Sequence, residues 1–408
     1  MKPITYSELK GNSKQFYALA AVLAVFILIA LACAYYMEHS GHHVTGMTNQ
    51  IVWGMPHVFA IFLIVAASGA LNVASIGTVF GKAIYKPLGR LSGLLAIALL
   101  IGGLIVLVLD LGRPDRLIVA MTSYNFKSIF AWNIFLYVGF MVIVAAYLWV
   151  QMERRMNRFA KTAGMLAFIW RLVLTTGTGS IFGFLVAREA YDSAIMAPLF
   201  VAMSFSLGLA VYILVLLGTY HASDRDIGDV VTRKLGRLLG VFIGAVLYFT
   251  AIQHLNNLYA AEHIAVERFI LLDGGIYTLL FWAGQVVVGG IIPLFLVFRP
   301  ADPGTYSRNV ILASILVILG GFAQIYVIVI GGQAFPLILF PGMEVSSSFS
   351  DGVVSAYAPS LPEIGLGIGG VALAGLIVLL GIKVLRFLPV SLANAAIDPH
   401  HKAASSES

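Results

Sequence analysis

The chain has 408 residues, of which 60% are hydrophobic and only 11% are charged, and its mean hydropathy is +0.94. Soluble domains carry about a quarter charged residues, so this composition excludes a soluble protein and indicates an integral membrane protein. The net charge of +6 would suit nucleic acid, but the basic residues are distributed as membrane topology requires, and we exclude nucleic-acid binding. A single cysteine, Cys33, excludes an internal disulfide and an iron–sulfur cluster.

Ten segments have about the 20 apolar residues that a helix needs to cross a bilayer. The first is too long for the core of a signal peptide, so we expect it to remain as a helix. We therefore predict an all-α integral membrane protein with ten transmembrane helices. The predicted helices are Phe16 to Met37, Gly54 to Ile76, Leu91 to Leu109, Ile129 to Met152, Ala163 to Val186, Met196 to Leu217, Leu238 to Leu255, Ile276 to Phe298, Val310 to Ile330, and Ile364 to Val384.

Basic residues divide unequally between the two sides of the membrane. Of the 25 Lys and Arg residues, 19 lie in the chain ends and in one alternating set of connections, and all but one of the others lie in the opposite set. Cytoplasmic connections are rich in Lys and Arg, so both termini are predicted to face the cytoplasm. Glycines four residues apart, as at Gly236, Gly240 and Gly244, predict close contacts between helices.

The third helix is followed by a charged segment, Asp110-Leu111-Gly112-Arg113-Pro114-Asp115-Arg116. Asp110 and Arg113 are three residues apart, so a last helical turn would place them on one face, where each neutralises the other. Pro114 ends the helix. The segment predicts a carboxylate and a guanidinium held at the outer edge of the membrane.

Other polar groups gather at the same outer ends of the helices. His57 is the one ionisable residue of the second helix; its imidazole can exchange a proton near neutral pH. Each group alone could be an interfacial charge paired with a neighbour. Together we interpret them as a functional site. In it, Asp110 or Glu189 is expected to be a buried carboxylate with raised pKa that transfers protons. The remaining members are Arg188, Asp192, Gln253, His254 and Glu262.

Several kinds of site are not expected. A membrane haem needs axial ligands that face one another at membrane depth, whereas His57 and His254 both lie at the outer edge. The His39, His42 and His43 cluster could bind a metal, but we favour a solvated loop and expect no metal site. No phosphate-binding glycine loop, serine triad or H-E-x-x-H motif appears.

Milder polar residues form two stripes inside the membrane. Arg171, Thr175 and Thr178 follow at helical spacing on the fifth helix, and Ser68, Asn72 and Ser75 do so on the second. The stripes could face each other, hold water and carry protons from the inner side. Alternatively, Arg171 extends to the inner surface and the hydroxyls bond their own backbone.

At these residues the chain resembles a known family. Asp110 to Pro114 with the following Arg116, then Asn125-Phe126-Lys127-Ser128 and Trp132, are similar to the membrane subunit of the polysulfide reductase family, also called NrfD/PsrC-like. The runs GFLVAREAYDSAIMAP (183–198) and FPGMEVSSSFSDG (340–352) resemble its ten-helix branch, found in periplasmic hydrogenase, Dsr-complex and alternative complex III assemblies. Ile129 and Phe130 depart from the family pattern, in which proline and a small residue are common.

The resemblance implies a membrane subunit that exchanges electrons between menaquinone or ubiquinone and a periplasmic-side iron–sulfur, ferredoxin-like partner, in a respiratory or sulfur-metabolism complex. It implies no haem or cluster in this chain, no activity of the chain alone, and a bacterial inner membrane. His57 would bind a quinone oxygen and Asp110 would carry the proton. Arg113, Arg188 and Trp132 would line the pocket.

The resemblance also implies the organisation of the chain as two four-helix bundles with a flanking helix at each end. The expected parts are 1–50 with the first helix, 51–195 as the first bundle with the quinone site, 196–330 as the second bundle, 331–363 as a periplasmic loop on which a partner sits, 364–386 as the tenth helix, and 387–408 as a cytoplasmic tail. From its polar composition, the part after Pro389 is expected to be disordered.

Two other classes remain open. A secondary transporter would place its polar site near the midplane, between broken helices, whereas the midplane here is almost uncharged. A structural anchor for a partner complex would need neither His57 nor charges at the rim.

Overall fold

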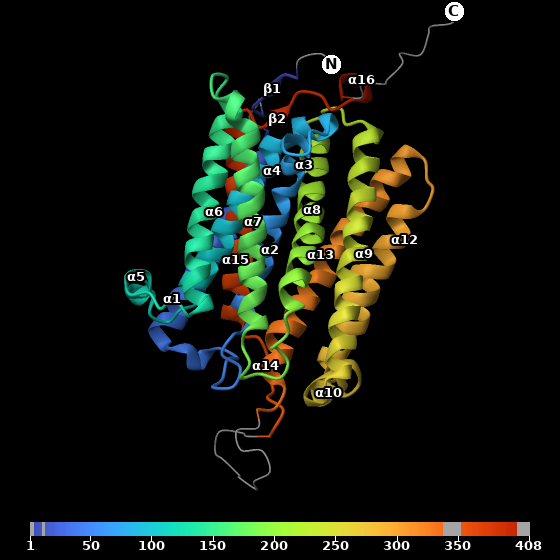
Figure 1. Cartoon of the computed structure of the whole chain (residues 1–408). Coiled ribbons are helices and arrows are strands. Elements are labelled where there is room, and N and C mark those ends of the chain that lie inside the picture. The colour runs from blue at the N-terminus through green and yellow to red at the C-terminus, as the bar shows by residue number, and fades with distance from the viewer. Residues whose placement is uncertain (1–3, 10–12, 338–351, 398–408) are drawn as a thin grey trace, which may run out of the picture.

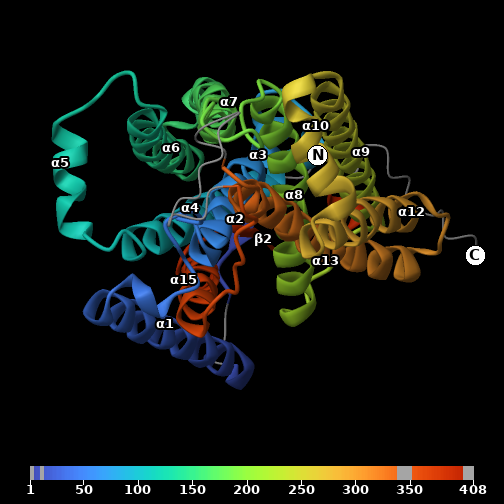
Figure 2. The ribbon, with the colours of Figure 1, turned by 90° about the horizontal axis from the view of Figure 1, so that it is seen from below.

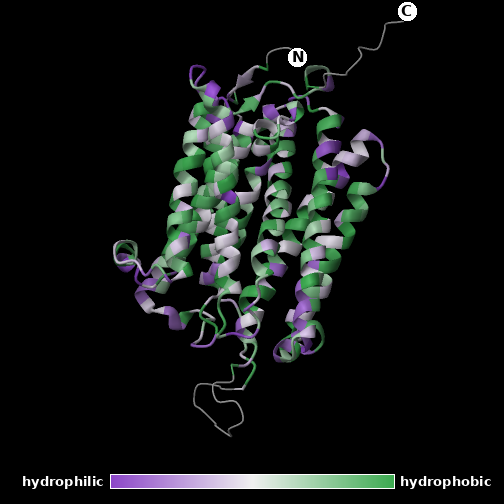
Figure 3. Cartoon of the chain, in the orientation of Figure 1, coloured by the Kyte–Doolittle hydropathy of each residue, from purple (hydrophilic) through white to green (hydrophobic). Residues whose placement is uncertain are grey.

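The computed structural model describes residues 4–9, 13–337 and 352–397, and the part of the chain that it describes is almost entirely helical. It contains 10 helices that are long and apolar enough to cross a membrane, which confirms the predicted fold class and count. Helices satisfy their own backbone hydrogen bonds, which a bilayer core requires. Hydrophobic residues follow the spans and hydrophilic residues gather towards the two ends of the molecule (Figure 3).

Four spans form a first bundle. Its helices pack as α2 on α4, α4 on α6, and α6 on α7. Three of the four spans are built from two consecutive elements. The bounds are α2 (Met55–Ala70) with α3 (Asn72–Thr78), η2 (Ala83–Leu88) with α4 (Gly89–Leu109), α6 (Ile129–Met152), and η4 (Asn157–Phe159) with α7 (Ala160–Gly183).

Four further spans form a second bundle, two of which contain π-helical segments. The bounds are α8 (Met196–Ala222), α9 (Asp229–Tyr259), α11 (Ile276–Leu279) with π-helix η7 (Leu280–Ile291) and α12 (Ile292–Phe298), and α13 (Pro303–Tyr326) with π-helix η8 (Val327–Gly331) and α14 (Gly332–Ala334). Helix α9 begins well before the predicted Leu238, because Arg233, Lys234 and Arg237 are helical although they are polar.

The two flanking helices lie together on one side. Helix α1 (Lys14–Ser40) packs against α15 (Leu361–Val384), and α15 packs against α4 and α2 (Figure 2). A capping box starts α15, in which the Ser360 hydroxyl accepts from the Glu363 amide and the Glu363 carboxylate accepts from the Ser360 amide.

Short elements mark two ends of the molecule, here named the site face and the terminal face (Figure 1). The site face carries α5 (Leu117–Thr122), α10 (Ile264–Arg268) and α14, with η1 (His42–Val44), η3 (Pro114–Arg116), η5 (Ala261–His263) and π-helix η6 (Phe269–Asp273) in the same connections. The terminal face carries β1 (Tyr6–Ser7), β2 (Leu388–Pro389) and α16 (Asn394–Ile397).

The expectation of a disordered tail after Pro389 was wrong for residues 390–397. Strand β2 pairs antiparallel with β1, with Tyr6 opposite Pro389, and Leu392 bridges to Ile227. Leu388 and Leu392 are buried, so apolar burial fixes this segment. Most of the run 340–352, with the expected partner contact on its loop, lies outside the described residues.

Helices α2 and α8 join the bundles at a close crossing. Gly69 faces the backbone of α8, and Gly208 faces the backbone of α2 at Ala70. A Cβ added to Gly208 would overlap the amide nitrogen of Ala70, so only glycine fits there. Residues 62–75 of α2 and α3 are buried, which places this helix at the centre of the molecule.

Candidate functional site at the end of the first bundle

Asp110 is buried at the end of helix α4. It follows Leu109 as the C-cap, and the chain reverses just beyond it at Gly112, whose φ is +67°. Glycine is favoured at that φ, and an added Cβ would lie 3.1 Å from the His42 ring. The Asp110 side chain is 0% exposed. The motif therefore holds a carboxylate inside the protein at the membrane edge.

Two histidines from different elements contact the Asp110 carboxylate. His57, in the first turn of α2, places Nδ1 2.9 Å from Oδ2 of Asp110. His42, on η1, places Nε2 3.8 Å from Oδ1 and 3.2 Å from the backbone oxygen of the same residue. Neither Asp110 carboxylate oxygen has an aligned hydrogen-bond donor in the described residues, so the contacts are mainly electrostatic.

These contacts change the pKa values of the group. Burial raises the pKa of Asp110, but the contacts with His42 and His57 outweigh it, and the net pKa lies below the ordinary value of 3.8. The Asp110 carboxylate in turn raises the pKa of His42 above 6.5. We expected the pKa of this buried carboxylate to be raised; for Asp110 this was wrong, because the two imidazoles beside it favour the ionised form. Its role in proton transfer stays a prediction.

The expected ion pair between Asp110 and Arg113 was also wrong. Arg113 instead contacts Asp115, with Nε 3.1 Å from Oδ1, and its side chain is 63% exposed. The i, i+3 argument fails because helix α4 ends at Leu109 and the turn at Gly112 carries Arg113 away. The motif thus contributes Asp110 to the buried group and Arg113 to the surface.

An aromatic group lies beside His57. The Trp53 ring stacks 6.2 Å from the His57 ring and lies 5.9 Å from Phe182 of α7 and 6.4 Å from Tyr191. Gln333 fixes Trp53: its Oε1 accepts from the Trp53 amide at 3.0 Å and its Nε2 donates to the Trp53 carbonyl at 3.0 Å. Sequence reasoning missed Trp53, His42 and Gln333; the Trp53-Gly54-Met55-Pro56-His57 order was the one local signal.

A cavity of ≈ 430 Å³ opens next to this group at the site face. Its lining includes His42, Met47, Val52, Asp110 and Leu111. This volume lies within the roughly 300–1,000 Å³ of small-molecule sites. The cavity therefore brings the buried Asp110 carboxylate, the imidazoles of His42 and His43 and apolar side chains to one place, whereas His57 and Trp53 lie next to Asp110 and to each other but are not among its lining residues.

Other predicted site residues lie elsewhere or serve the backbone. Arg188 donates to the carbonyls of Gln333 at 2.9 Å and Gln50 at 2.6 Å, and burial lowers its pKa. Glu189 is exposed, and its carbonyl accepts from His263 Nδ1 at 2.9 Å. Arg188 thus joins two loops around Trp53, and Glu189 is not the expected buried carboxylate.

Trp132 lies on α6 at the rim of the site face. Its indole nitrogen donates to the Phe126 carbonyl at 2.9 Å, and its ring lies 6.3 Å from that of Phe135. The residue is 46% exposed. The structure thus groups Trp132 with surface aromatics, whereas Phe130 of the same helix lies 5.9 Å from Trp53.

The two polar stripes face each other inside the first bundle. Arg171 is 0% exposed and donates to the Ser68 carbonyl at 3.3 Å and to Asn72 Oδ1 at 3.1 Å. Thr175 donates to the Ser68 hydroxyl, and the Thr178 hydroxyl lies 3.5 Å from Asn133 Oδ1. Arg171 therefore does not extend to the inner surface, although Thr175 and Thr178 also bond their own helix backbone.

Comparison with known proteins identifies the family. The family described as "Polysulphide reductase, NrfD" matches residues 43–337. The chain is 30% identical to the Hdr-like menaquinol oxidoreductase integral membrane subunit of Archaeoglobus fulgidus, over 97% of this chain and 99% of that protein. It is 29% identical to a putative membrane subunit of dimethyl sulfoxide reductase from Halobacterium salinarum, over 91% of each protein.

A shorter relative shows the same likeness. A polysulfide reductase chain of Wolinella succinogenes is 26% identical, over 70% of this chain and 96% of its own length. The match of the family over most of the chain and the ten membrane-spanning helices agree with the resemblance carried by the Asp110 motif. This chain is a multi-pass membrane protein that belongs to the polysulphide reductase NrfD family.

Proposed function

We propose that this chain is the quinone-reactive membrane subunit of an oxidoreductase complex. In this role it exchanges electrons between the menaquinone or ubiquinone pool and an iron–sulfur partner at the site face. The observation that carries the proposal is the buried Asp110–His57 pair beside a cavity at the membrane edge. A relative named as a menaquinol oxidoreductase subunit, aligned over nearly the whole chain, supports it.

The residues around the cavity fit a quinone. A quinone presents two oxygens that need polar partners and an apolar ring that packs on aromatic side chains. The ionised Asp110 carboxylate and the His57 ring nitrogen that faces away from it both accept hydrogen bonds, so this group suits the hydroxyl of a quinol. Trp53 supplies a ring face next to His57, and Val52 and Leu111 supply apolar lining.

In the proposed mechanism His57 exchanges the proton and Asp110 orients it. Because Nδ1 of His57 faces the carboxylate, the proton of the neutral ring belongs on Nδ1, which leaves Nε2 as an acceptor. A quinol supplies electrons and protons as it is oxidised. When Nε2 takes up a proton, the ionised Asp110 stabilises the resulting imidazolium.

His42 provides the outlet for that proton. It contacts the other carboxylate oxygen of Asp110, and its side chain is 32% exposed, whereas that of Asp110 is not exposed at all. A proton on His57 can therefore pass along the carboxylate to an imidazole that reaches water. The reverse direction, quinone reduction, uses the same atoms.

Proton uptake from the opposite side would use the Arg171 stripe. Exchange of electrons and protons at one face moves no charge across the bilayer, so energy conservation needs a second route. Arg171 and Thr175 with Ser68 and Asn72 form a continuous buried polar contact in the first bundle. Thr178, further along α7, contacts Asn133. A lower ratio of protons to electrons in an Arg171→Leu variant would support this route, and an unchanged ratio would show that the stripes serve packing.

Replacing His57 by leucine tests the quinone site. We expect the purified complex to lose most quinol-dependent electron transfer, because the proton acceptor is gone, while assembly is retained. His39→Leu is the matched control, since His39 lies on α1, is exposed and stacks only on Tyr35. Turnover of the His57 variant at the rate of the control would refute the proposal.

A further inference from the structure

A second set of buried polar side chains lies in the second bundle, on elements separate from Asp110 and His57. Glu267, on α10, is 0% exposed. One of its carboxylate oxygens lies 2.6 Å from His254 Nδ1, and the other accepts from Asn257 Nδ2 at 2.9 Å. The His254 side chain is 15% exposed, so this pair lies where the bundle meets the site face.

Polar side chains continue from this pair toward the middle of the bundle. Thr250, Gln253, His254 and Asn257 are spaced by three and four residues, so they share one face of α9. Thr250 is buried, and its hydroxyl accepts from Gln285 Nε2 at 3.3 Å and from Gln324 Nε2 at 3.2 Å. Three helices thus bring their polar groups to one hydroxyl.

These groups have hydrogen-bonding capacity that the described residues do not fill. Two amides donate to Thr250, but its own hydrogen has no acceptor in the described part of the protein. Gln253 donates only to the sulfur of Met196, at 3.5 Å, and sulfur is a weak acceptor. Asn257 Oδ1 is buried without a partner among the described residues. Buried polar groups in this condition are typically satisfied by ordered water.

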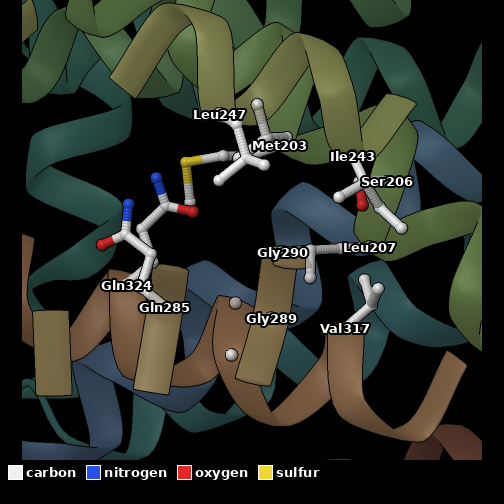
Figure 4. A pocket seen from close by; sticks show the side chains of 13 residues that line it. Met203, Ser206, Leu207, Ile243, Leu247, Gln285, Gly289, Gly290, Val317 and Gln324 are labelled. Atoms are coloured by element: carbon white, nitrogen blue, oxygen red, sulfur yellow. The ribbon is translucent and has the colours of Figure 1, made fainter. Parts of the chain in front are cut away.

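Two cavities offer room for that water. One of ≈ 30 Å³ is lined by Thr250, Gln253 and His254, and one of ≈ 20 Å³ is lined by Ser206 and Met203; both share Gln285 and Gln324. A water needs about 10–15 Å³. Gln285 and Gln324 lie together on one side of the smaller cavity, with Ser206 on the opposite side (Figure 4).

The backbone around the cavities is unusual as well. Gln285 lies in the π-helix η7, and Val327 and Ile328, which line the larger cavity, lie in the π-helix η8. Long π-helices are rare and are frequent at functional sites. Gly289 and Gly320 pack backbone to backbone, so the smaller cavity is not filled by side chains at that point.

We propose that this column is a water-filled half-channel for protons, which opens at the site face beside Glu267 and His254 and ends near the middle of the membrane. From Ile243 to Asn257 the helical rise of about 1.5 Å per residue gives roughly 20 Å, more than half of the ~30 Å hydrocarbon thickness. Beyond it, α9 presents buried Leu235 and Leu239, which close the path toward the terminal face.

Helix α8 connects this half-channel to the first bundle. Ser206 lines the smaller cavity, and the adjacent Phe205 has its ring 4.7 Å from the Arg171 guanidinium. The Arg171 stripe and the half-channel therefore come close at one turn of α8, where the contact between them is the apolar Phe205 ring, so a proton would need water to change bundles there. The half-channel depends on the proposed function in one respect, which is that electron transfer by the complex drives the protons.

The presence of water is tested without turnover. In X-ray hydroxyl-radical footprinting of the purified complex, Met196 and Met203 should be oxidised several-fold faster than Met37. Met196 and Met203 line the cavities and Met37 lines neither, while all three side chains are almost fully buried. Equal rates at the three methionines would show that the cavities are dry and overturn the proposal.

Proton transfer is tested in vesicles that contain the reconstituted complex. Glu267→Gln keeps the shape of the side chain but cannot carry a proton, so the number of protons moved per electron should fall, while electron transfer with an uncoupler is retained. Thr250→Val, which removes one hydroxyl at constant volume, should act in the same direction. Glu153→Gln is the control, because Glu153 is exposed at the end of α6 and belongs to neither proposed site.

An unchanged proton-to-electron ratio in both Glu267→Gln and Thr250→Val would overturn the half-channel. If the wild-type complex shows no quinol-dependent electron transfer, that result would instead overturn the proposed function. Footprinting distinguishes the two failures, because it reports water whether or not electrons flow.

Discussion

At the scale of single residues, the site depends on where one carboxylate is buried. Asp110 is removed from water and yet stays ionised, since two imidazoles approach it from different elements. A buried ionised group without such partners would cost several kcal/mol. The motif that carries Asp110 therefore works only when α2 and η1 bring His57 and His42 to it.

The His42–Asp110 contact predicts a pH dependence of stability. The pKa of His42 is raised above 6.5, so its contribution is full below that pH and is lost as the pH rises through the folded-state value. The pKa of Asp110 lies below 3.8, so its contribution is present above that pH and is lost only in stronger acid. The contact should thus stabilise the protein most between these limits.

His42→Gln should remove the part of the stability that declines above pH about 6.5. Thermal melting of the purified protein from pH about 5.5 to about 8 measures it, with His39→Gln as the control. If the difference in melting temperature between wild type and His42→Gln does not shrink as the pH rises, the contact is not charged.

Local sequence reasoning found Asp110 and His57 but not the second partner of Asp110. His42 lies 68 residues away in the sequence, and no periodicity links it to Asp110, so only the tertiary packing of η1 reveals the contact. Glu267 was missed for a similar reason. It lies just beyond an apolar segment in a stretch that reads as a connection, and its burial results from the packing of α10 on α9.

At the scale of elements, the α2–α8 crossing is where the bundles are held together. Both helices have a glycine at the contact, which lets their backbones approach directly. The spacing of glycines in the sequence did not indicate it. Gly240 of the predicted repeat does contact Phe298 and Val297, but an added Cβ at Gly244 would meet nothing within 4 Å.

Gly208→Ala should destabilise the protein by about 2 kcal/mol or more, because the new methyl group would overlap the backbone of α2 and the helices would have to separate. The melting temperature in detergent measures the change. Gly218→Ala, on the same helix with nothing within 4 Å, should instead be neutral or stabilising by up to ~1 kcal/mol. Similar losses in both variants would refute the close crossing.

At the scale of the whole molecule, the paired chain ends and the Asp110 site lie at opposite faces. Strands β1 and β2 pair at the terminal face, and Asp110 belongs to the connection between α4 and α5, which the site face carries. The membrane-spanning segments and their number could be predicted from the apolar runs along the sequence. A chain with ten such runs is expected to be an all-α membrane protein. How the helices associate was not readable from composition, and came from the family resemblance.

Reporter fusions test the orientation of the molecule. The excess of Lys and Arg on one side predicts that a reporter fused after Ser408 is active only if it works in the cytoplasm. A fusion after Thr122, at the end of α5 on the site face, should show the opposite activity. Periplasmic activity of the first fusion would place Asp110 on the cytoplasmic side instead.

The glycine crossing also limits how this protein can move. Proteins that work by alternating access rock one bundle against the other around a central site. Here the two bundles touch backbone to backbone at Gly69 and Gly208, where no side chain could repack into a second arrangement. We therefore expect motion during turnover to be concentrated in side chains, bound water and the short elements at the two faces, with this crossing as a fixed point between the bundles.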